Sequence, residues 1–353
     1  MVRYSQQRAT VLPFCFFTLL FPILKANAAC TQFTTNGSTS AYYDFYRFYD
    51  FRNLAPSSES PSIPTAFNNG QKHLSVVSWS SDWHAVSWFR PSSKPQNYDM
   101  QYISSAMSIV QNTAEPHEVP TYLSLSAKRL ANGTQFAAEL DYTKHSVTYA
   151  SMRVMARVRG ASGAVAGFFT YYDDTTESDV EIRTRDPSTQ VQLSNQPTTD
   201  LSTTVPIPGA TFTRPVEDYR AWNMYRLDWI HGRSAWYING VQSASTEVNV
   251  PDTPSTIILN MWSNGGEFSG KMQPEDEASF EVQWIELLYN TTTIASAEQG
   301  GEICSVEFAP GSPVSLASVN VQRSARNEAP EKNCSWSMGA MLVLALLSVF
   351  LLT

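Results

Sequence analysis

The sequence predicts an all-β protein in which two sheets pack face to face, as a β-sandwich or jelly roll. From about residue 40 to residue 290, short segments rich in β-branched and aromatic residues alternate with Gly, Asn, Asp, Ser and Pro. This alternation is typical of strands and turns. No segment carries a long apolar stripe at helical spacing, so helices are expected to be short. The chain of 353 residues is 42% hydrophobic, which suffices for one large core.

Each segment justifies a strand because strand-forming residues are followed by a turn residue. In chain order, the segments are YYDFYRFYDF (42–51), KHLSVVSW (72–79), TYLSLSAK (121–128), QFAAELDY (135–142), TYASMRVMARV (148–158), AGFFTYY (166–172), MYRLDWI (224–230), SAWYING (234–240), STIILNMW (255–262) and FEVQWIELLY (280–289). The clearest hairpin turn is Asn239-Gly240, which supplies two positions of positive φ. We expect one sandwich domain over residues 30–304, with no internal repeat.

The N-terminus has the features of a secretory signal. A basic lead is followed by the apolar run VLPFCFFTLLFPIL and by the small residues ANAA before Cys30. The apolar run is too short for a good membrane span, and Pro13 and Pro22 interrupt it. We therefore expect residues 1–29 to be a signal peptide.

The C-terminus carries a second processing pattern. Residues 331–353 end in the hydrophobic tail WSMGAMLVLALLSVFLLT, with no Lys or Arg after it. A polar spacer and small residues precede the tail, which fits a GPI-attachment signal with Asn327 as the attachment site. A single C-terminal membrane span without a cytosolic tail is the alternative. Residues 305–330, rich in Ser, Ala and Pro, predict a stalk, so we expect a secreted protein at the cell surface or in the cell wall, anchored to the plasma membrane.

The four cysteines agree with an extracellular location. Cys15 would leave with the signal peptide and Cys334 with the tail, so Cys30 and Cys304 are expected to form a disulfide. The sequons NGS, NGT and NTT also fit secretion. They make Asn36, Asn132 and Asn290 candidate glycosylation sites.

Charge and motifs exclude several classes of function. With a net charge of −8 and a pI near 5.2, binding to nucleic acid has no electrostatic support. The five His residues are scattered, with no H-E-x-x-H or H-x-H pair, so no catalytic metal site is expected. No G-x-S-x-G motif or phosphate-binding glycine loop is present. We expect a monomer without a cofactor and leave a structural calcium ion open.

The stretch ESDVE carries three carboxylates at alternate positions. In a strand, Glu177, Asp179 and Glu181 share one face, whereas the intervening residues face the other side. The alternative interpretation is a solvated surface strand, because Arg183 and Arg185 would lie on the acidic face and compensate it.

The spacing of the two glutamates suits one reaction. Residues four apart on a strand lie roughly 13 Å apart at Cα. Glutamate side chains that lean toward each other bring their carboxyls to roughly 5 Å, the separation used by glycosidases that retain anomeric configuration. Asp179 between them adds negative charge that favours a proton on one neighbour.

These residues resemble a known family. ESDVE resembles the E-[ILV]-D-x-E strand motif of glycoside hydrolase family 16, the β-glucanases and transglycosylases on a concanavalin A-like jelly roll. TYASMRVMARVRG resembles the strand before the catalytic hairpin of that family, AGFFTYYDDTTESDVE the hairpin, and SNQP the segment after it. MYRLDWIHGRSAWYING, PSTIILNMWSNGG and EVQWIELLYN follow in the order and spacing of the family. The resemblance covers residues 120–290 and is closest to a divergent, fungal-type, GPI-anchored member.

The resemblance implies a role for each carboxylate. Glu177 would be the nucleophile, Glu181 the general acid and base, and Asp179 the residue that tunes Glu177. Trp262 matches an aromatic residue of the family's cleft, with a core position as the alternative. Asn195 would bind a sugar hydroxyl, with a plain turn role as the alternative.

The chain departs from the family pattern at three positions. Ser178 stands in a slot for Ile, Leu or Val, where it could shift the strand. Asn223 replaces a common His, and Phe268 a common Trp. Elsewhere, Trp83 and Trp88 could line a cleft, although core packing is favoured.

We expect a retaining glycoside hydrolase that acts on a β-glucan-type polysaccharide at the cell surface. A wall-remodelling transglycosylase is the closest alternative, because the same intermediate can pass to another sugar. A lectin-like module that binds glycans without cutting them is the second alternative. A structural adhesive protein would fit the stalk and anchor but not the motif.

Overall fold

The computed structural model describes residues 30–35, 41–52, 54, 82–117, 119–144, 146–292, 302–306 and 321–323. Its named elements are strands and one short 3-10 helix. The first strands are β1 Cys30–Thr34, β2 Phe45–Asp50, β3 Trp83–Ala85, β4 Trp88–Arg90, β5 Met100–Tyr102, η1 Ser104–Ala106, β6 Met107–Gln111, β7 Thr121–Arg129, β8 Gln135–Tyr142 and β9 Val147–Gly160. They continue as β10 Val165–Asp173, β11 Thr176–Arg183, β12 Gln190–Asn195, β13 Thr211–Pro215, β14 Asn223–Ile230, β15 Arg233–Ile238, β16 Val241–Thr246, β17 Thr256–Trp262, β18 Glu277–Thr291, β19 Glu302–Val306 and β20 Val321–Arg323.

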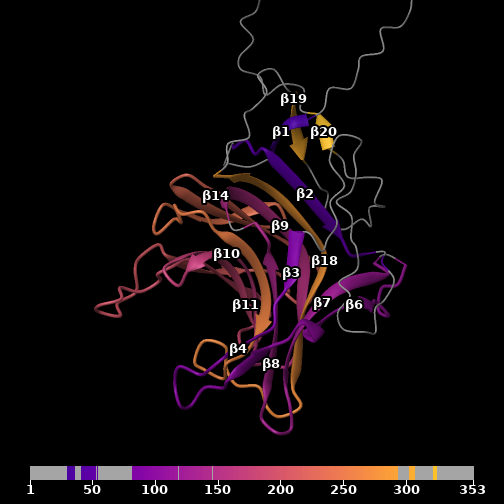
Figure 1. Cartoon of the computed structure of the whole chain (residues 1–353), viewed down its shortest axis with the longest axis vertical. Helices are drawn as coiled ribbons and strands as arrows, with labels where there is room; N and C mark the ends of the chain where they lie inside the picture. The colour runs from indigo at the N-terminus through magenta and orange to yellow at the C-terminus, as the bar shows by residue number, and fades with distance from the viewer. Residues whose placement is uncertain are drawn as a thin grey trace, which may run out of the picture.

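Two large sheets form the body of the molecule (Figure 1). One, the cleft sheet, has the order β3-β8-β17-β10-β11-β12-β13 and antiparallel pairing. The other, the outer sheet, has the order β16-β15-β14-β9-β18, with β2 and β7 along the far edge of the long strand β18. Strand β8 joins both, because its first residues pair with β5 and β7 and its last with β17.

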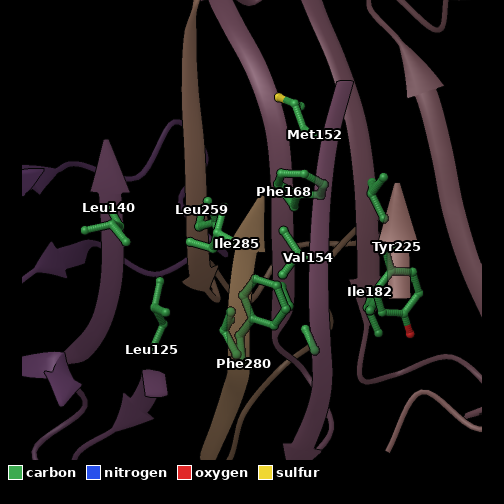
Figure 2. Packing of buried hydrophobic residues seen from close by; sticks show 14 of the residues in the cluster. Leu125, Leu140, Met152, Val154, Phe168, Ile182, Tyr225, Leu259, Phe280 and Ile285 are labelled. Atoms are coloured by element: carbon green, nitrogen blue, oxygen red, sulfur yellow. The ribbon is translucent and has the colours of Figure 1, made fainter. Parts of the chain in front are cut away.

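The hydrophobic core lies between the two sheets (Figure 2). Leu140, Phe168 and Leu259 come from the cleft sheet, and Val154 and Ile285 from the outer sheet, each at most 2% exposed. In each strand these residues alternate with side chains that point away from the core. The expected two-sheet β-sandwich is therefore confirmed.

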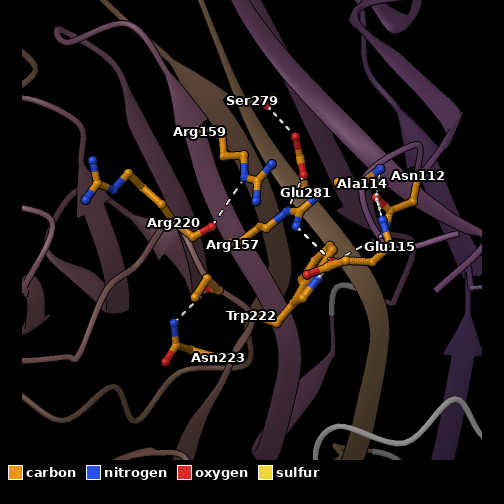
Figure 3. Close-up of polar contacts among 11 residues, drawn as sticks. Asn112, Ala114, Glu115, Arg157, Arg159, Arg220, Trp222, Asn223, Ser279 and Glu281 are labelled. Atoms are coloured by element: carbon orange, nitrogen blue, oxygen red, sulfur yellow. Dashed lines mark hydrogen bonds and ion pairs between the residues drawn. The ribbon is translucent and has the colours of Figure 1, made fainter. Parts of the chain in front are cut away.

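The far side of the outer sheet carries buried charges instead of open solvent-facing residues (Figure 3). Arg157 of β9 is ion-paired at 2.5 Å with Glu281 of β18 and at 3.3 Å with Glu115. Its guanidinium lies 4.0 Å from the ring centre of Trp222, whose indole nitrogen donates to Glu115 at 2.8 Å. This cluster joins two central strands to two loops on the side opposite the cleft.

Some local predictions are confirmed and others lie outside the described residues. Asn239 and Gly240 have φ values of 51° and 81° in the turn between β15 and β16, as a tight hairpin requires. The predicted strand at 72–79 lies outside the described residues, as do the signal peptide and the C-terminal tail. Strands β4, β5, β6 and β13 were not predicted, because each is only three to five residues long.

Strands β1, β19 and β20 form a small separate sheet at one end of the molecule (Figure 1). Cys30 is opposite Glu302 and Cys304 is opposite Phe33 in the parallel pairing of β1 with β19. This register offsets the cysteines by about 7 Å along the strands, whereas disulfides join Cα atoms within about 7 Å overall. The cysteines therefore lie on neighbouring strands but not opposite each other, and the disulfide stays a prediction.

The predicted stalk and modification sites are described only in part. Strand β19 crosses the expected domain boundary at residue 304, and β20 falls within the predicted stalk. Asn132 is exposed in the turn between β7 and β8. Asn290 accepts a hydrogen bond from the Asp44 amide at 2.8 Å. Asn36 and Asn327 lie outside the described residues, and in the described part no helix is long and apolar enough to cross a membrane.

Candidate active site

The three carboxylates of the ESDVE stretch lie on one face of β11. Val180 and Ile182, on the other face, are 3% and 2% exposed in the core. The pairing of β11 with β10 runs without a break from Arg183 to Glu177. The expected alternation is therefore confirmed.

Asp179 is the most enclosed of the three, with 1% of its surface exposed. Its Oδ2 accepts hydrogen bonds from Ser194 Oγ at 2.8 Å and from Gln196 Nε2 at 3.2 Å. Ser194 is directly opposite Asp179 in the pairing of β11 with β12. A neighbouring strand therefore holds the middle carboxylate in a fixed orientation.

Burial raises the pKa of all three carboxyls, and the charge of Asp179 raises the pKa of the two glutamates further. Burial raises the pKa of Glu177, and the charge of Asp179 raises it further. The same two causes, in the same order, hold the pKa of Glu181 well above its usual range. Burial also raises the pKa of Asp179, against the hydrogen bonds that it shares with Glu177 and its other donors. Because like charges this close disfavour full ionisation, the site retains protons where isolated carboxyls would lose them.

The two arginines that follow the motif have their direct contacts elsewhere, and the charge of Arg183 offsets only part of the rise in the pKa of Glu181 caused by burial and Asp179. Arg183 pairs with Asp186 at 2.7 Å and lies over the ring of Phe268. Arg185 donates to the backbone carbonyl of Glu267. No ion pair among the described residues includes a carboxylate of the motif. These contacts do not support the alternative of a self-compensating surface strand.

A cleft of about 410 Å³ lies over the face of the sheet that carries the two glutamates. Its walls come from β4, β5, β8, β10, β11 and β17 and from the loops that follow two of them. The lining residues are Trp88, Arg90, Tyr102, Glu139, Phe169, Tyr171, Asp174, Glu177, Glu181, Ile258, Asn260, Trp262 and Asn264. Such a cavity, with aromatic walls and a few polar groups, is typical of a ligand site.

Aromatic residues of the cleft give mixed outcomes for the sequence predictions. Trp262 lines the cleft and is stacked with Phe268 at 6.3 Å between ring centres. Trp83 is 2% exposed and lies in the core, so the prediction of core packing is confirmed for this residue. The same preference was wrong for Trp88, which is 40% exposed, lines the cleft and stacks on Tyr102.

Asn195 does not reach the cleft, so its predicted contact with a sugar is corrected. It is opposite Ser178 in the strand pairing and shares the core-facing side, with no exposed surface. Ser178 Oγ donates to Asn195 Oδ1 at 2.6 Å, and Asn195 Nδ2 donates to the Val248 carbonyl. The pair satisfies the polar serine in an apolar slot, which explains why Ser178 does not shift the strand.

Asn223 lies in the outer sheet, away from the cleft. Its amide donates to the carbonyls of Asp218 and Ala221, and its Oδ1 accepts from Asn239. The residue therefore orders a turn and contacts none of the three carboxylates.

Sequence reasoning missed two polar residues of the cleft, Glu139 and Asn260. They are opposite each other on β8 and β17. On the next strand, β10, Gly167 is opposite Asn260 and also opposite Glu181 of β11, so the four residues form one row across the sheet. The alternation of Glu139 and Asp141 with buried neighbours in QFAAELDY could have indicated a polar face on β8.

The arrangement can perform acid and base chemistry on a bound ligand. Two glutamates flank a buried aspartate on one wall of an aromatic cleft, and their shared protons allow one to be ionised while another is protonated. The described residues include no group of three or more His, Cys, Asp or Glu that could hold a metal ion.

Comparison with protein families matches the model for glycosyl hydrolases family 16 over residues 94–286. Among curated proteins, a beta-glucanase of Paenibacillus polymyxa is 25% identical over 217 residues, which covers 59% of this chain and 87% of the relative. A beta-glucanase of Paenibacillus macerans is 26% identical over 136 residues, 36% of this chain. The match spans only 55% of that relative's own length.

Solved structures are similar to this chain at low sequence identity. A beta-1,3-1,4-glucanase (lichenase) derived from a mouse hindgut metagenome has a TM-score of 0.48 and 16% identity, with 70% of this chain and 99% of that chain covered. A Bacillus licheniformis beta-glucanase has the same TM-score and identity, with 70% and 98% covered.

Proposed function

Since the chain belongs to glycosyl hydrolases family 16, we propose that it cleaves a β-glucan-type polysaccharide with retention of anomeric configuration. The observation that carries the proposal is the common face of Glu177, Asp179 and Glu181 beneath one aromatic cleft. A protein that only bound glycans would have no need to bury carboxylates that repel one another.

In the first step, the ionised Glu177 attacks the anomeric carbon, and Glu181 donates its proton to the glycosidic oxygen. The glycosidic bond breaks, the leaving sugar departs with the proton, and a glycosyl ester of Glu177 forms. In the second step, Glu181 takes a proton from water as the water oxygen attacks the anomeric carbon. The ester bond breaks, which restores Glu177 as a carboxylate and Glu181 as an acid.

Asp179 supports this cycle through its bond to Glu177. When the shared proton resides on Asp179, the aspartic acid donates a hydrogen bond to Glu177 and leaves it ionised as nucleophile. When the shared proton resides on Glu177 instead, the charge of the ionised Asp179 adds to burial in raising the pKa of Glu181. Trp262 offers a ring for the apolar face of a sugar.

The substrate class is proposed from the relatives, whose printed names are beta-glucanases. The test is to incubate the full-length protein with β-1,3, β-1,4 and mixed-linkage glucans, xyloglucan and chitin oligosaccharides, with products read by mass spectrometry. Nuclear magnetic resonance of fresh products gives the anomer. We expect shorter products that first appear as the β-anomer.

Three matched variants complete the test. Glu177→Gln and Glu181→Gln should each lower turnover by about 10² or more, whereas the exposed Glu217→Gln, which makes the same charge change elsewhere, should not. Unchanged turnover in either catalytic variant would contradict the assignment. Products longer than the donor would instead identify a transglycosylase, and binding without any product would identify a lectin-like module.

We also propose that the protein acts outside the cell, attached to the plasma membrane. The support is the signal-like N-terminal segment and the C-terminal hydrophobic tail, which a polar spacer and small residues precede. Treatment of intact cells with a phosphatidylinositol-specific phospholipase should release the protein into the medium. Retention on the membrane after treatment would favour a C-terminal span.

A further inference from the structure

A second pair of carboxylates, which the proposed mechanism does not use, lies on the cleft sheet: Glu139 lines the cleft, and Asp141 is its neighbour on the same face of β8. Glu139 and Asp141 lie two residues apart on β8, on the face that carries Glu181 three strands away. At strand geometry their Cα atoms are roughly 7 Å apart, with side chains on the same side. One sugar residue is small enough to contact both.

These carboxylates lack a full set of charged partners. Glu139 Oε1 accepts a hydrogen bond of 3.0 Å from the indole nitrogen of Trp88. Asp141 Oδ1 is buried without a hydrogen-bond partner among the described residues. No ion pair among the described residues includes Glu139 or Asp141.

The basic groups that face the pair are few. Arg90 acts on Glu139 but only as a minor influence, after burial and the charge of Asp141. His84 is opposite Asp141 in the pairing of β3 with β8, and it is exposed. Burial raises the pKa of Glu139 to about 7 and that of Asp141 to about 6. Both carboxylates would therefore be stabilised by a cation placed between them.

Asn260 adds a further oxygen beside Glu139, on the part of β8 and β17 that forms the floor of the cleft. It is 6% exposed, lies directly opposite Glu139, and its Oδ1 has no hydrogen-bond partner among the described residues. A side chain at Gly167 would place a Cβ only 2.6 Å from this buried oxygen, so the glycine leaves the space beside the oxygen unfilled. The floor thus combines the Glu139 carboxylate with buried oxygens of Asp141 and Asn260 that lack hydrogen-bond partners among the described residues. The rings of Trp88 and Trp262 stand beside it.

We propose that this floor is a subsite for a sugar that carries an ammonium group, such as a glucosamine residue within a β-linked glycan. An ammonium supplies three donors and a positive charge, which matches two carboxylates and one amide oxygen. Aromatic faces attract cations as well. A hydroxyl donates one hydrogen bond and leaves both charges uncompensated. This subsite deepens the proposed function, since it names a substrate class for the same cleft.

The test measures binding, so that it does not depend on turnover. Full-length protein carrying Glu177→Gln is titrated by calorimetry at pH 7 and low salt with β-1,4-linked tetraglucosamine, with its fully N-acetylated form and with cellotetraose. We expect the cationic tetramer to bind at least about ten-fold more tightly than either neutral one, with affinity that falls as salt is added.

Two further variants attribute the effect to the pair. Glu139→Gln with Asp141→Asn should remove the preference for the cationic tetramer. Glu217→Gln with Glu247→Gln, which removes two exposed charges outside the cleft, should keep it. Equal binding of the three tetramers, or a preference that survives in the first double variant, would overturn the proposal. Tight binding of cellotetraose alone would overturn the ammonium subsite and leave the proposed glucanase function intact.

Discussion

Ser194 Oγ donates a hydrogen bond of 2.8 Å to Asp179 Oδ2 across the pairing of β11 with β12. Ser194→Ala leaves that buried oxygen with Gln196 as its donor, at 3.2 Å. We expect the free energy of unfolding to fall by about 1–3 kcal/mol, since the acceptor stays buried when its donor is lost. Denaturant titration checks this. Ser202→Ala removes a similar bond to Asp200 at an exposed site and should cost clearly less; equal losses would contradict the prediction.

Asp179→Asn should shift the pH profile of turnover. The charge of Asp179 raises the pKa of Glu181, which must be protonated to act as the acid. Removal of the charge lowers that pKa, so the alkaline limb of kcat against pH should move to lower pH. A pH series on a cleaved glucan measures it, with Glu217→Gln as the control. An alkaline limb that stays in place or moves to higher pH would show that Asp179 does not tune Glu181.

Glu139 should make the protein less stable as pH rises. Burial raises its pKa from 4.5 in the unfolded reference to about 7 in the fold. Between these values the folded state binds the proton that the unfolded state has lost, so the free energy of unfolding falls as pH increases. Glu139→Gln should remove a decline on the order of 2–3 kcal/mol between pH 4.5 and 7.

Melting temperatures across pH 4 to 8 check this linkage. Glu139→Gln should be more stable than the wild type at pH 8, where the wild-type carboxylate is buried as a charge. The exposed Glu217→Gln should follow the wild-type curve. A Glu139→Gln curve parallel to the wild type would mean that the Glu139 carboxyl titrates normally in the fold.

Gly167→Ala should impair the cleft while the fold survives. The new Cβ would lie 2.6 Å from Asn260 Oδ1 and 3.2 Å from the Phe169 ring. Because the nearest atom ends a side chain that can rotate, we expect the melting temperature to change little. The displaced Asn260 would narrow the floor beside Glu181, and a misplacement near 1 Å can cost up to about 10²-fold in kcat/KM. Full activity in a folded Gly167→Ala protein would show that this space is not used.

The sandwich and the catalytic strand were predictable because they depend on local alternation. Val180 and Ile182 in the core require that Glu177 and Glu181 face the cleft, and this parity is visible in the sequence. The side of the sheet that Asn195 faces was predicted wrongly. Its neighbour Ser194 faces the cleft side, and a difference of one residue in a strand reverses the side that a side chain faces.

The rest of the cleft was not predictable from one strand at a time. Glu139, Gly167 and Asn260 meet only through the lateral order of β8, β17 and β10, which are separated in the sequence. Trp88 was misjudged because its short strand β4 is exposed throughout, so its aromatic character suggested a burial that did not occur.

Arg157 should stabilise the fold without contributing to activity. Its guanidinium, 2% exposed, is the cation for the buried Glu281 and packs on Trp222 (Figure 3). Arg157→Met would leave Glu281 buried without its partner, and we expect a loss of about 3–5 kcal/mol in the free energy of unfolding. Adding Glu281→Gln to Arg157→Met should recover much of it, because the uncompensated charge is then gone.

The matched control for Arg157 is Arg220→Met, which breaks an exposed pair with Asp218 and should cost far less. Below the melting temperature, kcat/KM of every folded variant should equal that of the wild type, because the cluster lies on the side of the outer sheet away from the cleft. Denaturant titrations of the wild type, Arg157→Met, Glu281→Gln and the double variant give the coupling energy between Arg157 and Glu281. A double variant no more stable than Arg157→Met would mean that lost packing on Trp222, and not the unpaired Glu281, causes the loss.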